Sequence, residues 1–160
     1  MEQLRIQRKD LYEIQVNDNG DTIVFQLGDL TLADKLNQAY EGIRKVQEEL
    51  RQKILIINKK KDFKPKNSII TNNQLAVSKA QKEAFLKMRK AIDLFLGEGG
   101  CQKVFGDDNY YEMFNDLFEA LEEKDENGLS HLDKMGISKD SIDKRIKEKY
   151  KDMQTRAQVI

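Results

Sequence analysis

The sequence is poor in the residues that build disulfides and metal sites. Its 160 residues include one cysteine, Cys101, and one histidine, His131. A single cysteine cannot form an internal disulfide and is typical of a chain in a reducing compartment. One cysteine and one histidine also exclude a zinc site of soft ligands within one chain. We therefore expect no metal and no other cofactor.

Excess charge of one sign and long apolar runs are also missing. The chain has 28 Lys and Arg residues and 28 Asp and Glu residues, so no net charge draws it to nucleic acid or to a membrane. No apolar run approaches the roughly 20 residues of a membrane helix. The first ten residues, MEQLRIQRKD, are charged throughout and do not resemble a secretory signal. We expect no membrane partner and a cytoplasmic location.

What is present begins with a turn. The stretch VNDNGDTI, residues 16–23, sets Asn19-Gly20 between two alternating apolar runs, which predicts a β-hairpin with a two-residue type I′ turn. Pairing outward from Asp18 and Asp21 predicts three apolar cross-strand pairs on one face. These are Val16 with Ile23, Ile14 with Phe25, and Tyr12 with Leu27.

Two ligand-binding loops compete with plain turns. A calcium loop starting at Asn17 would need Gly at its sixth position and Glu at its twelfth, where the chain has Thr22 and Gly28. The stretch GEGGCQKVFG, residues 97–106, has Lys103 after its glycines but lacks the spacing of a phosphate-binding loop. The interpretations that we favour are a hairpin turn and a helix end followed by a tight turn.

Two long helices follow the hairpin. The first is expected to begin at the N-cap Thr31 and to run for roughly 25 residues. Its apolar stripe, which forms either core or a coiled-coil-like seam, is Leu32, Leu36, Tyr40, Ile43, Val46, Leu50, Ile54 and Ile57. The second is expected from about Asn72 to Leu96, where GEGG stops it.

Two further helices are expected toward the end of the chain. Asn109 with Glu112 predicts the cap of a helix with a strongly aromatic face, and the last helix is expected to start near Ser138. The apolar faces are Tyr110, Met113, Phe114, Leu117, Phe118 and Leu121 for the first, and Ile142, Ile146, Tyr150 and Met153 for the last. The predicted class is therefore α+β, mostly α-helical, with an N-terminal β-hairpin packed against four to five helices. Residues 1–125 form the core domain and 126–160 a C-terminal helical arm.

Between the two long helices lies a basic connector, residues 58–67. Pro65 and the density of charge predict an exposed loop, whose lysines are Lys59, Lys60, Lys61, Lys64 and Lys66. With Phe63 these lysines could hold a phosphate backbone and stack a base, although a solvated linker is the interpretation that we favour.

Charge is neutral in sum but polarised along the chain. Residues 107–126 contain nine acids and one lysine, whereas residues 44–66 contain nine basic residues and three acids. Such a pattern favours docking of these regions within one chain or head-to-tail association of copies, unless both are simply solvated faces.

Catalytic chemistry finds no support in the sequence. Cys101 would need His131 as its base, and nothing in their spacing brings them together. The carboxylates of residues 107–126 mostly lie opposite the aromatic face, as on the wet side of an amphipathic helix. We expect a buried structural thiol and no enzyme.

Three stretches together carry a family resemblance. They are YEIQVNDNGDTIVFQLGDLTLADKLNQAYEGIRKV at residues 12–46, KAIDLFLGEGGCQKVFGDDNYYEMFNDLFEAL at residues 90–121, and the lysine-rich tail. Over roughly residues 10–125 the chain resembles the tail assembly chaperones encoded among the tail genes of tailed bacteriophages and prophages.

The resemblance implies a non-enzymatic protein of the host bacterial cytoplasm. It implies binding to the tape-measure protein, recruitment of tail-tube subunits and, in some members, a frameshifted longer form. The polarised charge adds self-association, in which successive copies are ordered along that partner. The expected partner contacts are Tyr40, Ile43, Tyr111, Phe114 and Phe118. Two alternatives remain open, namely a virion structural subunit of the tail or connector and a nucleic-acid-binding regulator that uses the lysines of residues 59–66.

Overall fold

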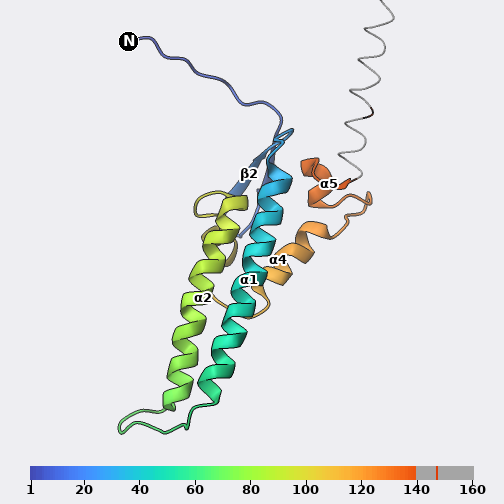
Figure 1. Ribbon diagram of the computed structural model, residues 1–160. Helices are drawn as coiled ribbons and strands as arrows, with labels where there is room; N and C mark the ends of the chain where they lie inside the picture. Colours follow the sequence, from blue (N-terminus) through green and yellow to red (C-terminus); the bar gives the residue numbers. More distant parts are fainter. Residues whose placement is uncertain (140–146, 148–160) are drawn as a thin grey trace, which may run out of the picture. The chain divides into compact units, whose positions relative to one another are not determined.

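The computed structural model describes residues 1–139 and residue 147, and this part of the chain contains one β-hairpin and five α-helices (Figure 1). The strands are β1 (Leu11–Gln15) and β2 (Thr22–Gln26), and the helices are α1 (Leu32–Asn58), α2 (Asn72–Leu96), α3 (Gly100–Phe105), α4 (Met113–Glu122) and α5 (His131–Met135). The predicted class, α+β and mostly α-helical with an N-terminal hairpin, is confirmed.

The chain divides into two compact units. Unit 1 comprises Met1–Leu32 together with the chain from Tyr110 onward, and unit 2 comprises Ala33–Asn109. Unit 1 therefore holds the hairpin, α4 and α5, and unit 2 holds α2, α3 and nearly all of α1. The predicted boundary at residue 125 stays a prediction, and the predicted last helix lies outside the described residues.

The hairpin of unit 1 has the predicted face but not the predicted register. Ile14 pairs with Ile23 and Tyr12 with Phe25, two residues away from the expected partners. The reason is the turn, because the Asn17 side chain accepts hydrogen bonds from the backbone N–H groups of Asn19 (2.9 Å) and Asp21 (3.2 Å). This closes a four-residue loop, a type common in hairpins.

The type I′ turn itself is excluded. Such a turn needs positive φ at both central residues, whereas Gly20 has a φ of 85° and Asn19 is not among the positive-φ residues of the described chain. A shift of two residues keeps every side chain on its predicted face. Ile23 and Phe25 are accordingly buried.

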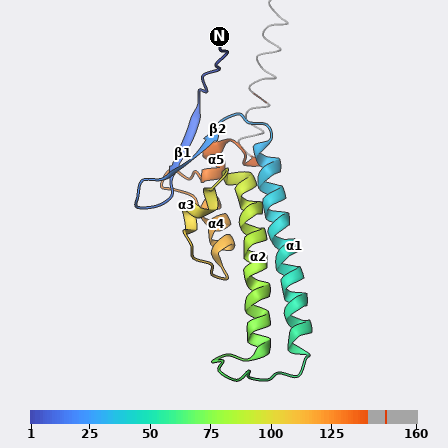
Figure 2. The ribbon, with the colours of Figure 1, turned by 90° about the vertical axis from the view of Figure 1, so that its left-hand side faces the viewer.

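In unit 2 the helices α1 and α2 form an antiparallel pair that lies side by side in both ribbon views (Figures 1 and 2). The backbones come close at Gly42, where an added Cβ would lie 3.3 Å from the Cβ of Ala91. Helix α1 begins at Leu32, directly after Thr31, as predicted. The predicted cap is wrong, because the Thr31 hydroxyl donates to Asp29 (2.7 Å) instead of accepting from the helix. Asp29 also accepts from the Thr31 N–H (2.9 Å) and so organises this start.

The second long helix runs from Asn72 to Leu96, as predicted, and ends at Gly97 with a φ of 94°. Positive φ favours glycine, so the glycines of this stretch end α2 and start α3. Asp93 accepts from the N–H of Cys101 (2.8 Å) and ties α3 to α2.

The predicted cap of α4 is wrong. Asn109 accepts a hydrogen bond from Arg89 Nε (2.8 Å), and Arg89 also donates to the carbonyl oxygen of Asp108 (2.6 Å). The Asn109 side chain therefore binds Arg89 and does not cap the helix. Helix α4 begins at Met113 without a side-chain cap.

Candidate functional site

The connector between α1 and α2 is the part of unit 2 that combines exposed apolar side chains with concentrated charge. Figure 2 shows it as the loop that joins the two long helices. We define the connector surface by its exposed side chains. They are the apolar Leu55, Ile56, Phe63, Ile69 and Ile70 and the basic Lys59, Lys60, Lys61, Lys64 and Lys66.

The connector is held by backbone contacts rather than left as a loose linker. Asp62 Oδ1 accepts from the N–H groups of Phe63 (2.9 Å) and Asn73 (2.9 Å). The buried Asn73 side chain donates to the carbonyl oxygen of Lys60 (3.0 Å). The backbone N–H of Asn72 donates to the carbonyl oxygen of Phe63 (2.8 Å). The two ends of the loop are thereby tied together across more than ten residues.

The electrostatics of Asp62 follow from these bonds. The backbone N–H of Asn73 and the Thr71 hydroxyl hold the pKa of Asp62 below its usual range, because they stabilise the ionised carboxylate. Thr71 also forms a capping box with Gln74, in which the N–H of each residue donates to the other's side chain (2.8 and 3.2 Å). The start of α2 is therefore fully engaged and offers no open anion site.

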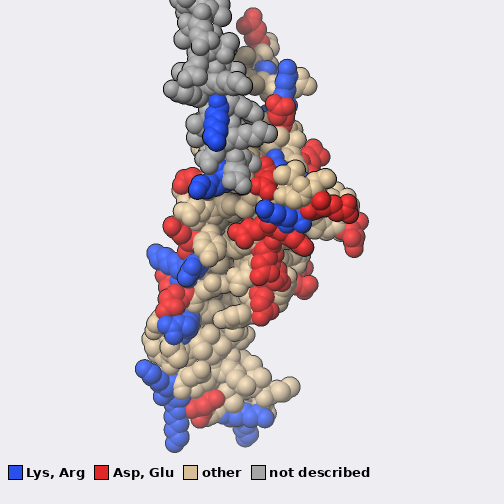
Figure 3. Space-filling model, turned by 90° about the vertical axis from the view of Figure 1, so that its right-hand side faces the viewer, with Lys and Arg blue, Asp and Glu red and all other residues tan. Residues whose placement is uncertain are grey.

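The five lysines form the basic part of the connector surface. All are exposed, and within the described residues none of them makes an ion pair. In Figure 3, blue side chains stand out at the connector end of the long helices. The lysines that follow α1 are also well placed against the negative end of its dipole.

An exposed Phe63 is in line with the predicted loop, but the exposure of the aliphatic residues beside it was not predicted from the sequence. The side chain of Phe63 is 59% exposed and that of Ile69 94% exposed. A signal was present, because Ile54–Ile57 are four consecutive apolar residues and a helix turns them to different sides. Two of the four, Leu55 and Ile56, are the ones that the structure leaves exposed.

The predicted partner contacts on α1 have opposite environments. Tyr40 is 42% exposed, with the Arg44 guanidinium 5.7 Å from its ring centre and within 3.4 Å of its hydroxyl. Ile43 is only 2% exposed. Ile43 is therefore core, whereas part of the Tyr40 side chain lies at the surface beside Arg44. The role of both residues as partner contacts stays a prediction.

The predicted contacts near α4 divide in the same way. Tyr111 is 72% exposed, Phe114 is 1% exposed, and Phe118 is half-buried. Phe114 and Phe118 each make a further interaction, as Tyr40 does. Of the five predicted residues, Tyr40 and Tyr111 are therefore the two that a partner can reach without a change in the structure.

The outer side of α4 is acidic. We define the acidic stripe as Glu112, Asp116, Glu119 and Glu123, all of them exposed. Their spacing of four, three and four residues places them on one side of a helix, opposite the buried Met113, Phe114 and Leu121. Red side chains gather over the face that Figure 3 shows.

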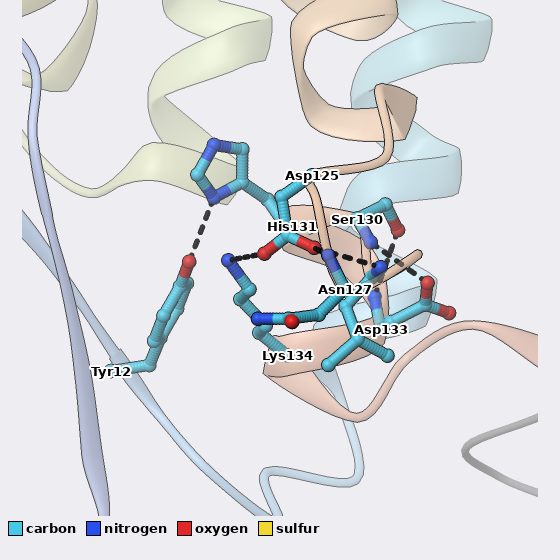
Figure 4. A network of polar contacts seen from close by, with 8 residues as sticks. Tyr12, Asp125, Asn127, Ser130, His131, Asp133 and Lys134 are labelled. Carbon is cyan, nitrogen blue, oxygen red and sulfur yellow. Dashed lines mark hydrogen bonds and ion pairs between the residues drawn. The ribbon is translucent and has the colours of Figure 1, made fainter.

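A polar network organises the other end of unit 1 (Figure 4). Asp125 accepts from the N–H groups of Asn127 (2.9 Å) and Leu129 (3.0 Å) and pairs with Lys134 (2.7 Å). The Lys134 ammonium is the main cause that lowers the pKa of Asp125. These contacts shape the turn that leads into α5.

The single cysteine and the single histidine are both committed to structure. Cys101 is buried, and burial raises the pKa of its thiol to about 11, so the reactive thiolate is scarce at neutral pH. His131 Nδ1 lies 2.7 Å from the hydroxyl oxygen of Tyr12 on β1 (Figure 4). That contact connects α5 to the hairpin inside unit 1.

The part of the chain that the structure describes lacks both a metal-binding cluster and a membrane-spanning helix. Residues 1–139 and 147 contain no group of three or more His, Cys, Asp or Glu side chains that could hold a metal ion. In that same part of the chain, each helix is too short or too polar to cross a membrane.

Comparison of the chain with protein-family models, with curated proteins and with solved structures found no match.

Proposed function

We propose that the chain is a non-enzymatic assembly chaperone of the phage-tail type, which works in the cytoplasm of the bacterial host. It binds a helical segment of a tape-measure protein and helps to recruit tail-tube subunits. The resemblance over residues 10–125 supplies the identity of the partner. The observation that supports binding most directly is the exposure of Tyr40 and Tyr111, two large aromatic side chains on a small chain.

Exposed tyrosines suit a protein-binding role for a physical reason. They bury a large area on binding at a small loss of side-chain freedom, and they are enriched among residues that dominate interfaces. The Arg44 guanidinium lies over the Tyr40 ring, 5.7 Å from its centre, and donates a hydrogen bond to the Tyr40 hydroxyl (3.4 Å). A side chain held in this way loses less entropy on binding.

The test is co-expression of the full chain with helical fragments of a cognate tape-measure protein, followed by affinity capture and native mass measurement. Stoichiometric capture is expected, with a loss of about tenfold or more in Tyr40→Asp and Tyr111→Asp, because each change puts a charge into an apolar contact. Both residues are exposed, so both variants are expected to remain folded.

Leu86→Asp is the matched control, because Leu86 is an exposed apolar residue on α2 outside the predicted contacts. A folded chain that captures no fragment would contradict the proposal. Capture that is equal in the wild type, both tyrosine variants and the control would contradict the assigned contacts.

A second candidate is a nucleic-acid-binding regulator, and it is favoured by Phe63, which is exposed among five exposed lysines. Fluorescence anisotropy with a labelled single-stranded oligonucleotide tests it. Binding should weaken steeply with salt and weaken further in a Lys60→Gln, Lys64→Gln variant. No binding at low salt would exclude this function.

A virion structural subunit is the third possibility, and it rests on the same resemblance to tail genes. It differs from a chaperone in remaining in the particle. Mass spectrometry of purified virions separates them, because a chaperone is absent from the finished particle and a subunit is present in stoichiometric amount.

A further inference from the structure

The connector surface has a composition that defines its partner. Exposed apolar side chains favour a contact that excludes water, and five lysines without an ion pair in the described chain favour an anionic partner. The loop is ordered by Asp62 and Asn73, so the surface is formed before anything binds. The occupant that fits is an acidic amphipathic helix.

The chain itself contains such a helix. The acidic stripe of α4 presents four carboxylates on one side, and Tyr111, 72% exposed, directly precedes it. Within the described residues none of the four carboxylates makes an ion pair. The stripe therefore supplies the negative charge that matches the lysines, and Tyr111 supplies an exposed aromatic side chain beside it.

Part of the acidic stripe is unfavourable for α4 alone, although Asp116 in the first turn suits the helix dipole. Like charges four residues apart destabilise a helix, and the stripe has such pairs at Glu112 with Asp116 and at Glu119 with Glu123. Acids near the C-terminal end of a helix oppose its dipole, and the last turn of α4 contains no basic residue. A cationic surface placed over the stripe would relieve both effects.

We propose that the connector surface of one copy of this chain docks on the acidic stripe of a second copy. The contact is heterologous, because two different surfaces meet, so copies associate head-to-tail in a chain or close reciprocally. Apart from Tyr111, the two surfaces contain none of the contacts assigned to the tape-measure protein. Docking between copies therefore does not depend on that partner.

The first test is sedimentation velocity of the nuclease-treated full chain over a range of concentrations, at low and high salt. Association should rise with concentration and weaken by about tenfold or more between roughly 50 and 500 mM salt, because the contact pairs opposite charges. A chain that is monomeric at every concentration, as it would be if the two surfaces met within one copy, overturns the inference. So does an association that nuclease removes, which would show nucleic acid as the bridge.

Charge reversal identifies the surfaces. Lys60→Glu with Lys64→Glu changes the connector surface, and Asp116→Lys with Glu119→Lys changes the acidic stripe. Each double variant should associate about tenfold or more weakly than the wild type, because like charges then face each other. Circular dichroism establishes that both variants are folded.

The matched controls carry the same charge changes elsewhere on exposed helix positions. Lys82→Glu with Lys90→Glu is the control for the connector, and Glu41→Lys with Glu83→Lys is the control for the stripe. Both controls should associate as the wild type does. Equal weakening in a control and its test variant would mean that net charge alone matters, and it would overturn the assignment.

Mixing the two reversed variants is the decisive step. The intact connector lysines of the stripe variant can then bind the intact stripe of the connector variant. The two reversed surfaces also carry opposite charges and can bind each other. The mixture should recover association with a 1:1 composition although each variant alone has lost it. Failure of two folded variants to recover association overturns the inference.

Discussion

The connector and the α4 segment, residues 107–126, have similar compositions but expose different residues. Each sets an aromatic residue among charges of one sign, yet Phe63 is 59% exposed and Phe114 is 1% exposed. In α4 the helical period turns aromatic residues to one side and acids to the other. In the connector, consecutive apolar residues and a loop without a period leave apolar and basic groups on the same surface. Periodicity, rather than composition, thus decides which apolar residues stabilise the fold and which are left for a partner.

The largest expected effect comes from truncating the two phenylalanines in parallel. Phe114→Ala should lower the free energy of unfolding by about 3–5 kcal/mol, because it leaves a cavity in a buried site. Phe63→Ala should change it by less than about 0.5 kcal/mol, as for an exposed residue. Urea denaturation followed by circular dichroism measures both. Equal losses would contradict the contrast between the two regions.

The reactivity of a thiol compares the exposed connector with a buried site, that of Cys101 in α3, without a measurement of stability. Cys101 should react with a disulfide reagent about a hundredfold or more slowly than a cysteine placed in the connector by Lys64→Cys, because burial keeps its pKa near 11 and blocks access. Absorbance at pH 8 follows both thiols, and a denaturant should make their rates equal. Comparable rates in the folded protein would show that the connector is closed or that the Cys101 site is open.

The order of the connector depends on the side chain of Asn73, and the neighbouring Asn72 provides a control. Asn73→Ala should cost about 1–2 kcal/mol and speed hydrogen exchange across residues 59–71, because the buried amide bonded to Lys60 is lost. Asn72→Ala, at an exposed position, is the control and should leave both quantities nearly unchanged. Unaltered exchange in Asn73→Ala would mean that this amide does not hold the loop.

The smallest effect distinguishes the carboxylates of the two regions. Asp62 has a lowered pKa chiefly through the backbone N–H of Asn73, and Asp125 chiefly through the Lys134 ammonium. Both therefore add stability that is present above the ordinary pKa of 3.8 and is lost as the pH falls through the folded value. Carboxyl titration by NMR should show added salt weakening the shift of Asp125 more than that of Asp62, since salt screens the exposed ion pair. Equal salt dependence would contradict these causes.

Much of the fold could be predicted because its signals are local and periodic. The bounds of α2, the glycine end that follows it and the apolar face of the hairpin are as predicted. The register of the hairpin was wrong because the Asn17 side chain favoured a longer loop. The caps at Thr31 and Asn109 were wrong because Asp29 and Arg89 engage those side chains, and such competition is invisible to a pattern of residue types.

The candidate site was less predictable. The lysines of the connector and Phe63 among them could be predicted as exposed from the charge of the loop, but the exposure of Ile69 and Ile70 could not. Spacing indicated only that Ile43 and Phe114 lie on apolar faces, and the same spacing is typical of core and of a partner-binding seam. Burial, which separates the two, depends on contacts between elements distant in the sequence.

The most direct test of the account is a cross-link between copies. A photoreactive phenylalanine analogue in place of Phe63, in a mixture of ¹⁴N- and ¹⁵N-labelled chains, reports by mass spectrometry which peptide the connector touches. The account predicts mixed-isotope cross-links from the connector to the peptide that contains residues 112–123. Cross-links found only within chains of one isotope, or to other peptides, would contradict it.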